Sequence, residues 1–250
     1  MIKSKKNHPS EKYLFPKMPS IEGIELGAIN ANISSEDKLD LMVAKLAPSS
    51  IACGVFTKSQ TASAAVKWSK RNLEARPDKS LPIGLIVNSG NANVFTGGNG
   101  ASVVADTAKT LAKELNSTVE NIFIASTGVI GELLDINKLQ TNIAPLVKRL
   151  SKNSYKEAAE AIMTTDTFTK GVSRQLEING QKITLNGIAK GSGMIAPNMA
   201  TMLVYILTDI SIPRTLMRVM LKEAVAHSFN TISVDSDEST SDTIVLLSSK

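Results

Sequence analysis

The apolar residues of this chain are gathered into short runs of strand length, each bounded by Gly, Asn, Ser or Pro. Leu81–Val87, Val119–Ala125 and Met202–Thr208 are the clearest of these runs. Bounded runs of this length are typical of buried strands. Ala101–Leu115 instead repeats its apolar residues at helical spacing. Because strands and helices alternate without a strict strand–helix–strand repeat, the sequence predicts an α/β fold with mixed sheets.

The same patterns predict the remaining elements. Asn179-Gly180 lies between two alternating segments and supplies the two positive φ angles of a tight hairpin turn. Pro145 should break or kink the helix that Asp135–Leu150 otherwise predicts. The other expected strands lie in 21–57, 231–234 and 243–247, and the other expected helices are 155–163 and 213–228.

Composition excludes several classes of site. Hydrophobic residues make up 42% of the 250 residues and aromatic residues only 4%, so the core must be aliphatic. The single cysteine, Cys53, excludes an intramolecular disulfide framework and a cysteine-based zinc site. The two histidines, His8 and His227, exclude most histidine-ligated metal sites and leave a Ser-His-Asp triad possible only through His227. Catalysis in this chain must therefore use other residue types.

The basic excess is concentrated at the start of the chain. The formal net charge is +5, and residues 1–17 contain five lysines against one glutamate. A nucleic-acid binder usually concentrates Lys and Arg on its folded surface, so we expect residues 1–20 to be a basic flexible leader and expect no nucleic-acid partner. The leader lacks the apolar region of a secretory signal, and the longest apolar run is far shorter than the ~20 residues that span a membrane. We expect a soluble, cytoplasmic protein.

Two glycine-rich stretches resemble phosphate-binding patterns. Asn88–Asn93 and Thr96–Gly100 lie between a strand and a helix, where backbone N–H groups can hold an anion. No Gly-Lys-Ser/Thr follows, so we favour a structural or site-lining role for this loop. Lys190–Ala196 fits the G-x-G-x-x-G/A dinucleotide pattern, but Pro197 and the strand at Met202 leave no room for the helix that this pattern requires.

The Ala200–Thr201 junction has features that suit a nucleophile. A lysine, two close glycines and a proline lead into a small residue and a hydroxyl residue. Such a backbone can hold a strained peptide bond beside a nucleophile. A threonine hydroxyl also needs a base. An α-amine created on Thr201 by cleavage has a reference pKa of ~7.7–8.0, close to working pH, and would serve as that base.

Four stretches of the chain resemble one enzyme family. Lys190–Leu203, KGSGMIAPNMATML, is similar to the self-cleavage motif of the ornithine acetyltransferase (glutamate N-acetyltransferase) family of arginine biosynthesis. Asn88–Asn93, Ser126–Gly131 and Met163–Thr167 resemble further stretches of the same family, in the same order. The resemblance covers residues 21–250. It implies an α/β layered sandwich with mixed sheets, similar to but distinct from the N-terminal-nucleophile hydrolases.

The resemblance implies that the chain cleaves itself between Ala200 and Thr201. Thr201 would then begin a second chain and act as the catalytic nucleophile, with Thr127 and Gly128 stabilising the oxyanion. The implied reaction is that of a glutamate N-acetyltransferase, which moves an acetyl group from N-acetylornithine to glutamate through an acetyl-threonine intermediate. The sequence leaves open whether acetyl-CoA is also a donor, which would add amino-acid N-acetyltransferase activity.

The resemblance also implies substrate contacts and an assembly. Thr164 and Lys190 match substrate-binding positions of the family, and Thr201 itself contacts the substrate. Residues 21–200 would form the large segment and 201–250 the start of the small segment, with pairs of the two assembled into a heterotetramer. The resemblance implies no metal and no other cofactor.

Other candidate residues have simpler interpretations. His227 lies near the end of an amphipathic helix, and Cys53 lies in an apolar strand where it would be a core residue. The acidic segment 235–242, DSDESTSD, has Ser236 where the family usually has glycine, and it also differs at Glu238 and Ser241. Because this segment lacks the glycine and terminal glutamate of a calcium loop, we interpret it as a turn.

Two other functions stay open. An N-terminal-nucleophile amidase or aminopeptidase would use the same nucleophile with water as the acceptor. A non-catalytic binding or assembly subunit would keep the fold without cleaving. The family's further substrate-binding residues would lie beyond Lys250, so we expect the 250-residue chain to be incomplete and poorly active alone.

Overall fold

The aliphatic runs pair into two sheets. The computed structural model describes residues 14–34, 37–75, 77–196 and 202–250. The first sheet has four strands in the order β1 (Ile24–Ile29), β2 (Leu41–Leu46), β4 (Ile83–Asn88) and β5 (Ile122–Ser126). The second sheet has five strands in the order β3 (Ile51–Phe56), β9 (Thr243–Ser248), β8 (Leu203–Thr208), β7 (Gln181–Lys190) and β6 (Lys170–Ile178).

Each sheet is mixed, as the sequence predicts. The pairs β4–β5 and β8–β9 are parallel, and the other neighbouring strands are antiparallel. Parallel neighbours need a crossover connection. Helix α2 (Gly97–Leu115) lies between β4 and β5 in the chain, and helix α5 (Arg214–Ala226) lies between β8 and β9.

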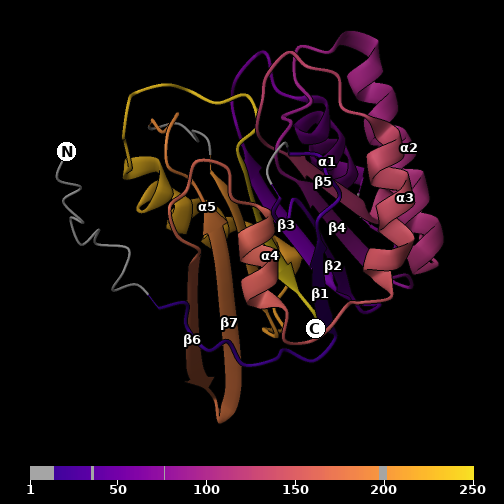
Figure 1. Ribbon diagram of the computed structural model, residues 1–250. Coiled ribbons are helices and arrows are strands. Elements are labelled where there is room, and N and C mark those ends of the chain that lie inside the picture. The colour runs from indigo at the N-terminus through magenta and orange to yellow at the C-terminus, as the bar shows by residue number, and fades with distance from the viewer. Residues whose placement is uncertain (1–13, 35–36, 76, 197–201) are drawn as a thin grey trace, which may run out of the picture.

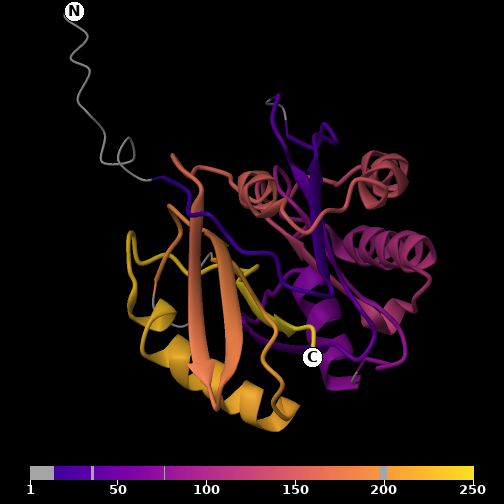
Figure 2. The ribbon, with the colours of Figure 1, turned by 90° about the horizontal axis from the view of Figure 1, so that it is seen from below.

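The sheets stack face to face between helices (Figures 1 and 2). Helices α2 and α3 (Ile136–Val147) cover the outer face of the first sheet, and α5 covers the outer face of the second. Helix α1 (Ala64–Ala75) packs on β5 and β3, and α4 (Tyr155–Ala161) packs on β1 and β7. Two 3-10 turns complete the described elements, η2 (Val119–Asn121) and η3 (Phe229–Thr231). The prediction of an α/β layered sandwich is confirmed.

The largest core lies between the two sheets. Leu85 and Phe123 point into it from the first sheet, and Tyr205 and Leu247 from the second, all with at most 1% of their surface exposed. Burying one such side chain stabilises the fold by about 1.5–3 kcal/mol. Two smaller cores lie under the outer helices, and Cys53 is buried in the one beneath α5, as predicted.

The predicted hairpin is confirmed. Strands β6 and β7 are joined at Asn179 and Gly180, which have φ angles of 52° and 75°. Two positive φ angles in succession are what a type I′ turn requires. The hairpin extends below the body of the molecule in Figure 1, and Leu176 and Ile178 near its tip are exposed.

One predicted strand is wrong, and one predicted helix break does not occur. Residues 231–234 form no strand: η3 ends at Thr231, and Val234 is 61% exposed because no sheet neighbour covers it. Helix α3 is not broken at Pro145 but continues to Val147. Pro145 lies in the last turn of the helix, so only the final residues of α3 follow it. A proline at this position therefore disturbs few of the helix's hydrogen bonds.

The apolar patterns did not reveal α1. Its buried face includes the polar residues Ser69 and Asn72 as well as Ala65, Val66 and Leu73. Ser69 Oγ donates to the Ile124 carbonyl over 2.7 Å, and Asn72 Nδ2 donates to the Ile122 carbonyl over 2.9 Å. Polar side chains that bind a neighbouring strand interrupt the apolar repeat on which a helix prediction depends.

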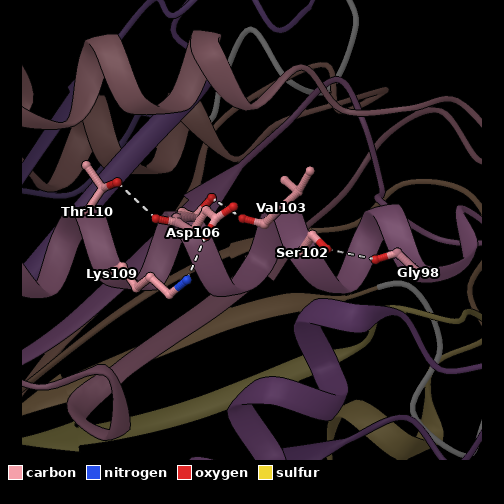
Figure 3. A network of polar contacts seen from close by, with 7 residues as sticks. Gly98, Ser102, Val103, Asp106, Lys109 and Thr110 are labelled. Atoms are coloured by element: carbon pink, nitrogen blue, oxygen red, sulfur yellow. Dashed lines mark hydrogen bonds and ion pairs between the residues drawn. The ribbon is translucent and has the colours of Figure 1, made fainter.

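Helix α2, with 19 residues, satisfies its own hydroxyl groups (Figure 3). Ser102 Oγ donates to the Gly98 carbonyl, Thr110 Oγ1 donates to the Asp106 carbonyl, and Lys109 pairs with the Asp106 carboxylate. Bonds of this kind satisfy the hydroxyls within the helix itself.

No helix in the described ranges, α2 included, is long and apolar enough to cross a membrane.

Candidate active site

A cleft of about 740 Å³ opens where β5 and β7 end. Thr127 and Gly128 follow β5 on one wall, and Lys190 is the last residue of β7 on the other. Thr164 and Thr165, from the loop after α4, also line the cleft. The structure therefore brings together the four described residues to which the sequence assigned a role: Thr127, Gly128, Thr164 and Lys190.

The two predicted cleavage-site residues, Ala200 and Thr201, lie outside the described residues. The chain on either side is described. Ile195 and Ala196 are buried before the gap, and Met202 is buried after it. Gly193 and Met194 line the same cleft as Thr127.

A buried hydrogen bond connects the two walls. Lys190 Nζ donates to Thr127 Oγ1 over 2.6 Å, and the two residues are only 3% and 4% exposed. A lysine ammonium has three donors and no acceptor, so Thr127 Oγ1 accepts in this contact. This contact does not use the hydroxyl hydrogen of Thr127, so Thr127 is still able to donate a hydrogen bond.

Burial governs the charge on Lys190. Loss of water lowers the pKa of Lys190 to about 8, against the opposing attraction of the Asp166 and Asp242 carboxylates. The ammonium therefore remains protonated at neutral pH and keeps its bond to Thr127. The pKa of Asp242 moves in the opposite direction. Burial raises it to about 8, although the hydrogen bond from the Met202 N–H and the charge of Lys190 both act to lower it.

Gly128 brings its backbone against another loop. Its φ angle is +129°, and a Cβ built on it would lie 2.3 Å from the Gly90 carbonyl carbon and 2.5 Å from the Asn91 nitrogen. The neighbouring Val129 N–H donates to the Gly90 carbonyl over 3.1 Å. Within the described part of the chain, no backbone acceptor pairs with the Gly128 N–H. A second donor thus lies next to the Thr127 hydroxyl at the cleft.

The loop that supports Gly128 is held by side-chain amides. Asn88 Nδ2 donates to the Asn91 carbonyl over 2.8 Å, and Asn93 Nδ2 donates to the Gly100 carbonyl over 3.1 Å. Gly90 itself lines the cleft. The structural and site-lining interpretation of this asparagine-rich loop is confirmed.

Asp40 fixes the loop that packs on Gly90. Its carboxylate accepts the N–H groups of Ala31, Ile33 and Ser34 over 2.7, 2.6 and 2.8 Å, and Asp40 is fully buried. A Cβ on Gly90 would lie 2.8 Å from the Ser34 nitrogen. The sequence does not single out Asp40, because its partners are backbone N–H groups, which every residue type except proline provides.

Asp166 is the second functional residue that sequence reasoning missed. Its carboxylate accepts the Gly191 N–H over 2.8 Å and the Thr164 N–H over 3.3 Å, and it pairs with the Lys170 ammonium. Burial alone would raise the pKa of Asp166, but its bonds to Lys170 and these two N–H groups lower it below the ordinary value. Asp166 therefore fixes Thr164 beside the turn that follows Lys190. The sequence does contain a signal for Asp166, because this residue lies in the stretch 163–167 that resembles the family.

The remaining candidates fit their simpler interpretations. His227 is the residue that ends α5, and its N–H donates to the Glu223 carbonyl. In the described ranges, no group of three or more His, Cys, Asp or Glu side chains could hold a metal ion. Two carboxylates of the acidic segment 235–242 instead accept backbone N–H groups: Asp235 from Met194 and Ile195, and Asp242 from Met202.

Comparison with known proteins gives one family. A sequence profile described as the ArgJ family matches residues 25–250. The arginine biosynthesis bifunctional protein ArgJ of Ruegeria pomeroyi is 43% identical over 246 residues, covering 98% of this chain and 60% of that protein. The protein of the same name from Gluconobacter oxydans is 42% identical over 231 residues, covering 92% of this chain and 54% of that protein. The chain thus spans little more than half the length of these curated relatives.

A solved structure agrees with the fold. The crystal structure of ornithine acetyltransferase from Mycobacterium tuberculosis, complexed with ornithine, is similar with a TM-score of 0.64 at 34% sequence identity. The match covers 70% of this chain and 92% of that chain.

The close approach of Gly128 to Gly90 predicts a difference between two glycines. Gly131 also has a positive φ, +84°, but a Cβ there would meet nothing within 4 Å. Gly131→Ala should therefore lower the free energy of unfolding only by the backbone strain, about 1–2 kcal/mol. Gly128→Ala should lower it by about 1–3 kcal/mol more, because the backbone must move to admit the methyl group. Urea unfolding of the two variants measures the difference, and equal losses would show that the approach is not tight.

Burial of Asp242 predicts a pH dependence of stability. Between its ordinary pKa of ~3.9 and about 8, the folded state keeps a proton that the unfolded state releases. The free energy of unfolding should therefore fall as pH rises through this window, by up to about 1.4 kcal/mol per pH unit. Asp242→Asn should remove this contribution, whereas Asp209→Asn should keep it. Unfolding midpoints from pH 5 to pH 8 test this, and an unchanged slope in Asp242→Asn would contradict it.

Proposed function

The chain belongs to the ArgJ family, and from this we propose that it is a self-cleaving glutamate N-acetyltransferase of arginine biosynthesis. It moves the acetyl group of N-acetylornithine to glutamate through an acetyl-threonine intermediate. The observation that carries the proposal is the 2.6 Å bond from Lys190 to Thr127 beside the Gly128 N–H, because it leaves two hydrogen-bond donors at one cleft. Two such donors are what an oxyanion needs.

Cleavage of the chain is the first step of the proposed function. Thr201 Oγ attacks the Ala200 carbonyl carbon, the peptide C–N bond breaks, and the nitrogen takes up a proton to become the α-amine of Thr201. Water then hydrolyses the resulting ester and restores the hydroxyl. The products are residues 1–200, which contain the large segment 21–200, and a small segment that begins at Thr201.

Acetyl transfer uses the same hydroxyl. The α-amine of Thr201 takes the proton from Oγ as it attacks the acetyl carbonyl of N-acetylornithine. The tetrahedral oxyanion accepts hydrogen bonds from the Thr127 hydroxyl and the Gly128 N–H. Loss of one such donor typically costs about 2.7–4 kcal/mol of transition-state stabilisation. Ornithine leaves with a proton, and glutamate then takes the acetyl group from Thr201.

Lys190 and Thr164 bind the substrate in this proposal. Lys190 uses one of its three donors on Thr127, so two remain for a substrate carboxylate. Thr164 lines the same cleft, and Asp166 fixes its backbone. Lys190 thus orients the oxyanion donor and attracts the substrate with one charge.

The assembly and setting follow the family. Large and small segments from one precursor form a heterotetramer in the cytoplasm, without a metal or other cofactor. Acetyl-CoA is a possible second donor, which would make the protein bifunctional. A non-catalytic subunit, or an amidase or aminopeptidase that gives the acyl group to water, would share the fold, so chain cleavage and acceptor use distinguish these functions.

Cleavage is the first test. The purified chain should separate into two pieces, the smaller beginning at Thr201. Thr201→Ala should stay whole, because no side-chain oxygen remains to attack, and Thr201→Ser should retain some cleavage. Denaturing mass spectrometry with N-terminal sequencing measures the products. A new N-terminus at any other residue, or a chain that stays intact under all conditions, would rule out the proposed nucleophile.

Acetyl transfer is the second test. Incubation with N-acetylornithine and no glutamate should add one acetyl group to the peptide that begins at Thr201. Thr127→Val should slow this acetylation about 100-fold or more, because the oxyanion loses a donor, whereas Thr127→Ser keeps the hydroxyl and should stay close to wild type. Peptide mass spectrometry follows the time course. Equal rates for the valine and serine variants would exclude Thr127 from the oxyanion site.

A further inference from the structure

Residues 234–243, which include the acidic segment, contact the chain on both sides of the predicted cleavage bond. The gap in the described residues, 197–201, contains Ala200–Thr201. Before it, the Val234 N–H donates to the Ile195 carbonyl over 2.8 Å. After it, the Thr243 N–H donates to the Met202 carbonyl over 3.0 Å. One short segment of the chain thus binds both flanks of the gap.

Asp235 holds the flank before the gap. Its two carboxylate oxygens accept the N–H groups of Met194 and Ile195 over 2.5 and 2.8 Å. Met194 has a φ angle of +57°, a conformation that is uncommon and costly for a residue with a side chain. The bonds to Met194 and Ile195 lower the pKa of Asp235, so it is charged at neutral pH and accepts from both groups. Asp235 therefore stabilises a turn that the local sequence disfavours.

Asp242 holds the flank after the gap. Its Oδ1 accepts the Met202 N–H over 2.8 Å, and the residue is fully buried. Met202 directly precedes β8, whose first residue, Leu203, pairs with Lys190. Asp242 therefore fixes Met202 beside the strand end that carries Lys190, the donor to Thr127.

We propose that Asp235 and Asp242 are positioning residues, which fix the chain on both sides of the cleavage bond and thereby speed its cleavage. The proposal rests on the proposed function, because it presumes cleavage at Ala200–Thr201. Attack by a neighbouring hydroxyl depends on the angle and distance at the carbonyl, and misplacement by 1 Å can cost about 100-fold in rate.

The experiment follows cleavage of newly synthesised precursor. Asp235→Ala and Asp242→Ala should each slow cleavage about 100-fold. Asp242→Asn retains an oxygen that accepts the Met202 N–H and should stay within a few-fold of wild type. Asp235→Asn offers one acceptor oxygen instead of two, so its cleavage rate should lie between those of Asp235→Ala and wild type. Pulse synthesis, followed by denaturing mass spectrometry at successive times, gives the rates.

Asp209→Ala is the matched control. Asp209 also accepts a backbone N–H, that of Thr184 over 2.8 Å, but it follows the opposite end of β8 from Met202. This variant should cleave at the wild-type rate, although it loses the same kind of bond, and its thermal midpoint measures what that loss costs in stability.

The outcomes separate the two proposals. If wild type cleaves at Ala200–Thr201 while Asp235→Ala and Asp242→Ala cleave as fast as Asp209→Ala, the positioning role is refuted and the proposed function stands. If wild type does not cleave there, the proposed function and the positioning role both fail. Slow cleavage by Asp235→Ala with normal cleavage by Asp209→Ala supports positioning even if Asp242→Ala does not fold, because Asp235 is exposed and its loss leaves the core intact.

Discussion

One buried hydrogen bond joins the two halves of the candidate site. Lys190 ends β7 in the five-stranded sheet, and Thr127 follows β5 in the four-stranded sheet, so the contact between them crosses from one sheet to the other. A buried ammonium is costly unless it is paired and hydrogen-bonded. The packing of the sheets and the chemistry of the cleft are therefore coupled, because a shift of one sheet against the other would leave Lys190 without its partner.

The charges around this bond come from distant parts of the chain and are balanced locally. The ionised Asp166 attracts the Lys190 ammonium, while Lys170 opposes it and is itself paired with Asp166. Because the Asp166 carboxylate offsets part of the cost of burial, Lys190 keeps its proton at neutral pH. Asp166 and Asp242 also accept backbone N–H groups on the turns that lead into and out of the cleft. Electrostatics and backbone geometry thus depend on the same few side chains.

The sequence predicted the strands better than it predicted this network. Bounded aliphatic runs identify buried strands because burial demands that residue type, and the hairpin at Asn179 required only local φ preferences. Residues 231–234 carry the same residue types, but no neighbouring strand covers them. Roles were assigned to Thr127, Gly128, Thr164 and Lys190 because they lie in recognisable stretches, and the structure brings the four to one cleft. Their contacts were not predicted, since 63 positions of chain separate Lys190 from Thr127 and no local pattern encodes such a pairing.

The acidic segment shows why residue type alone could not assign these carboxylates. A turn, a metal site and a pair of backbone acceptors all need Asp at short spacing, and the partners that distinguish them are N–H groups about 40 positions away. Ser236 has a φ angle of +64°, a left-handed conformation that costs a residue with a side chain about 1–2 kcal/mol. The bonds that Asp235 makes to Met194 and Ile195 offset that cost. The strained turn persists because it places the neighbouring carboxylate where both N–H groups reach it.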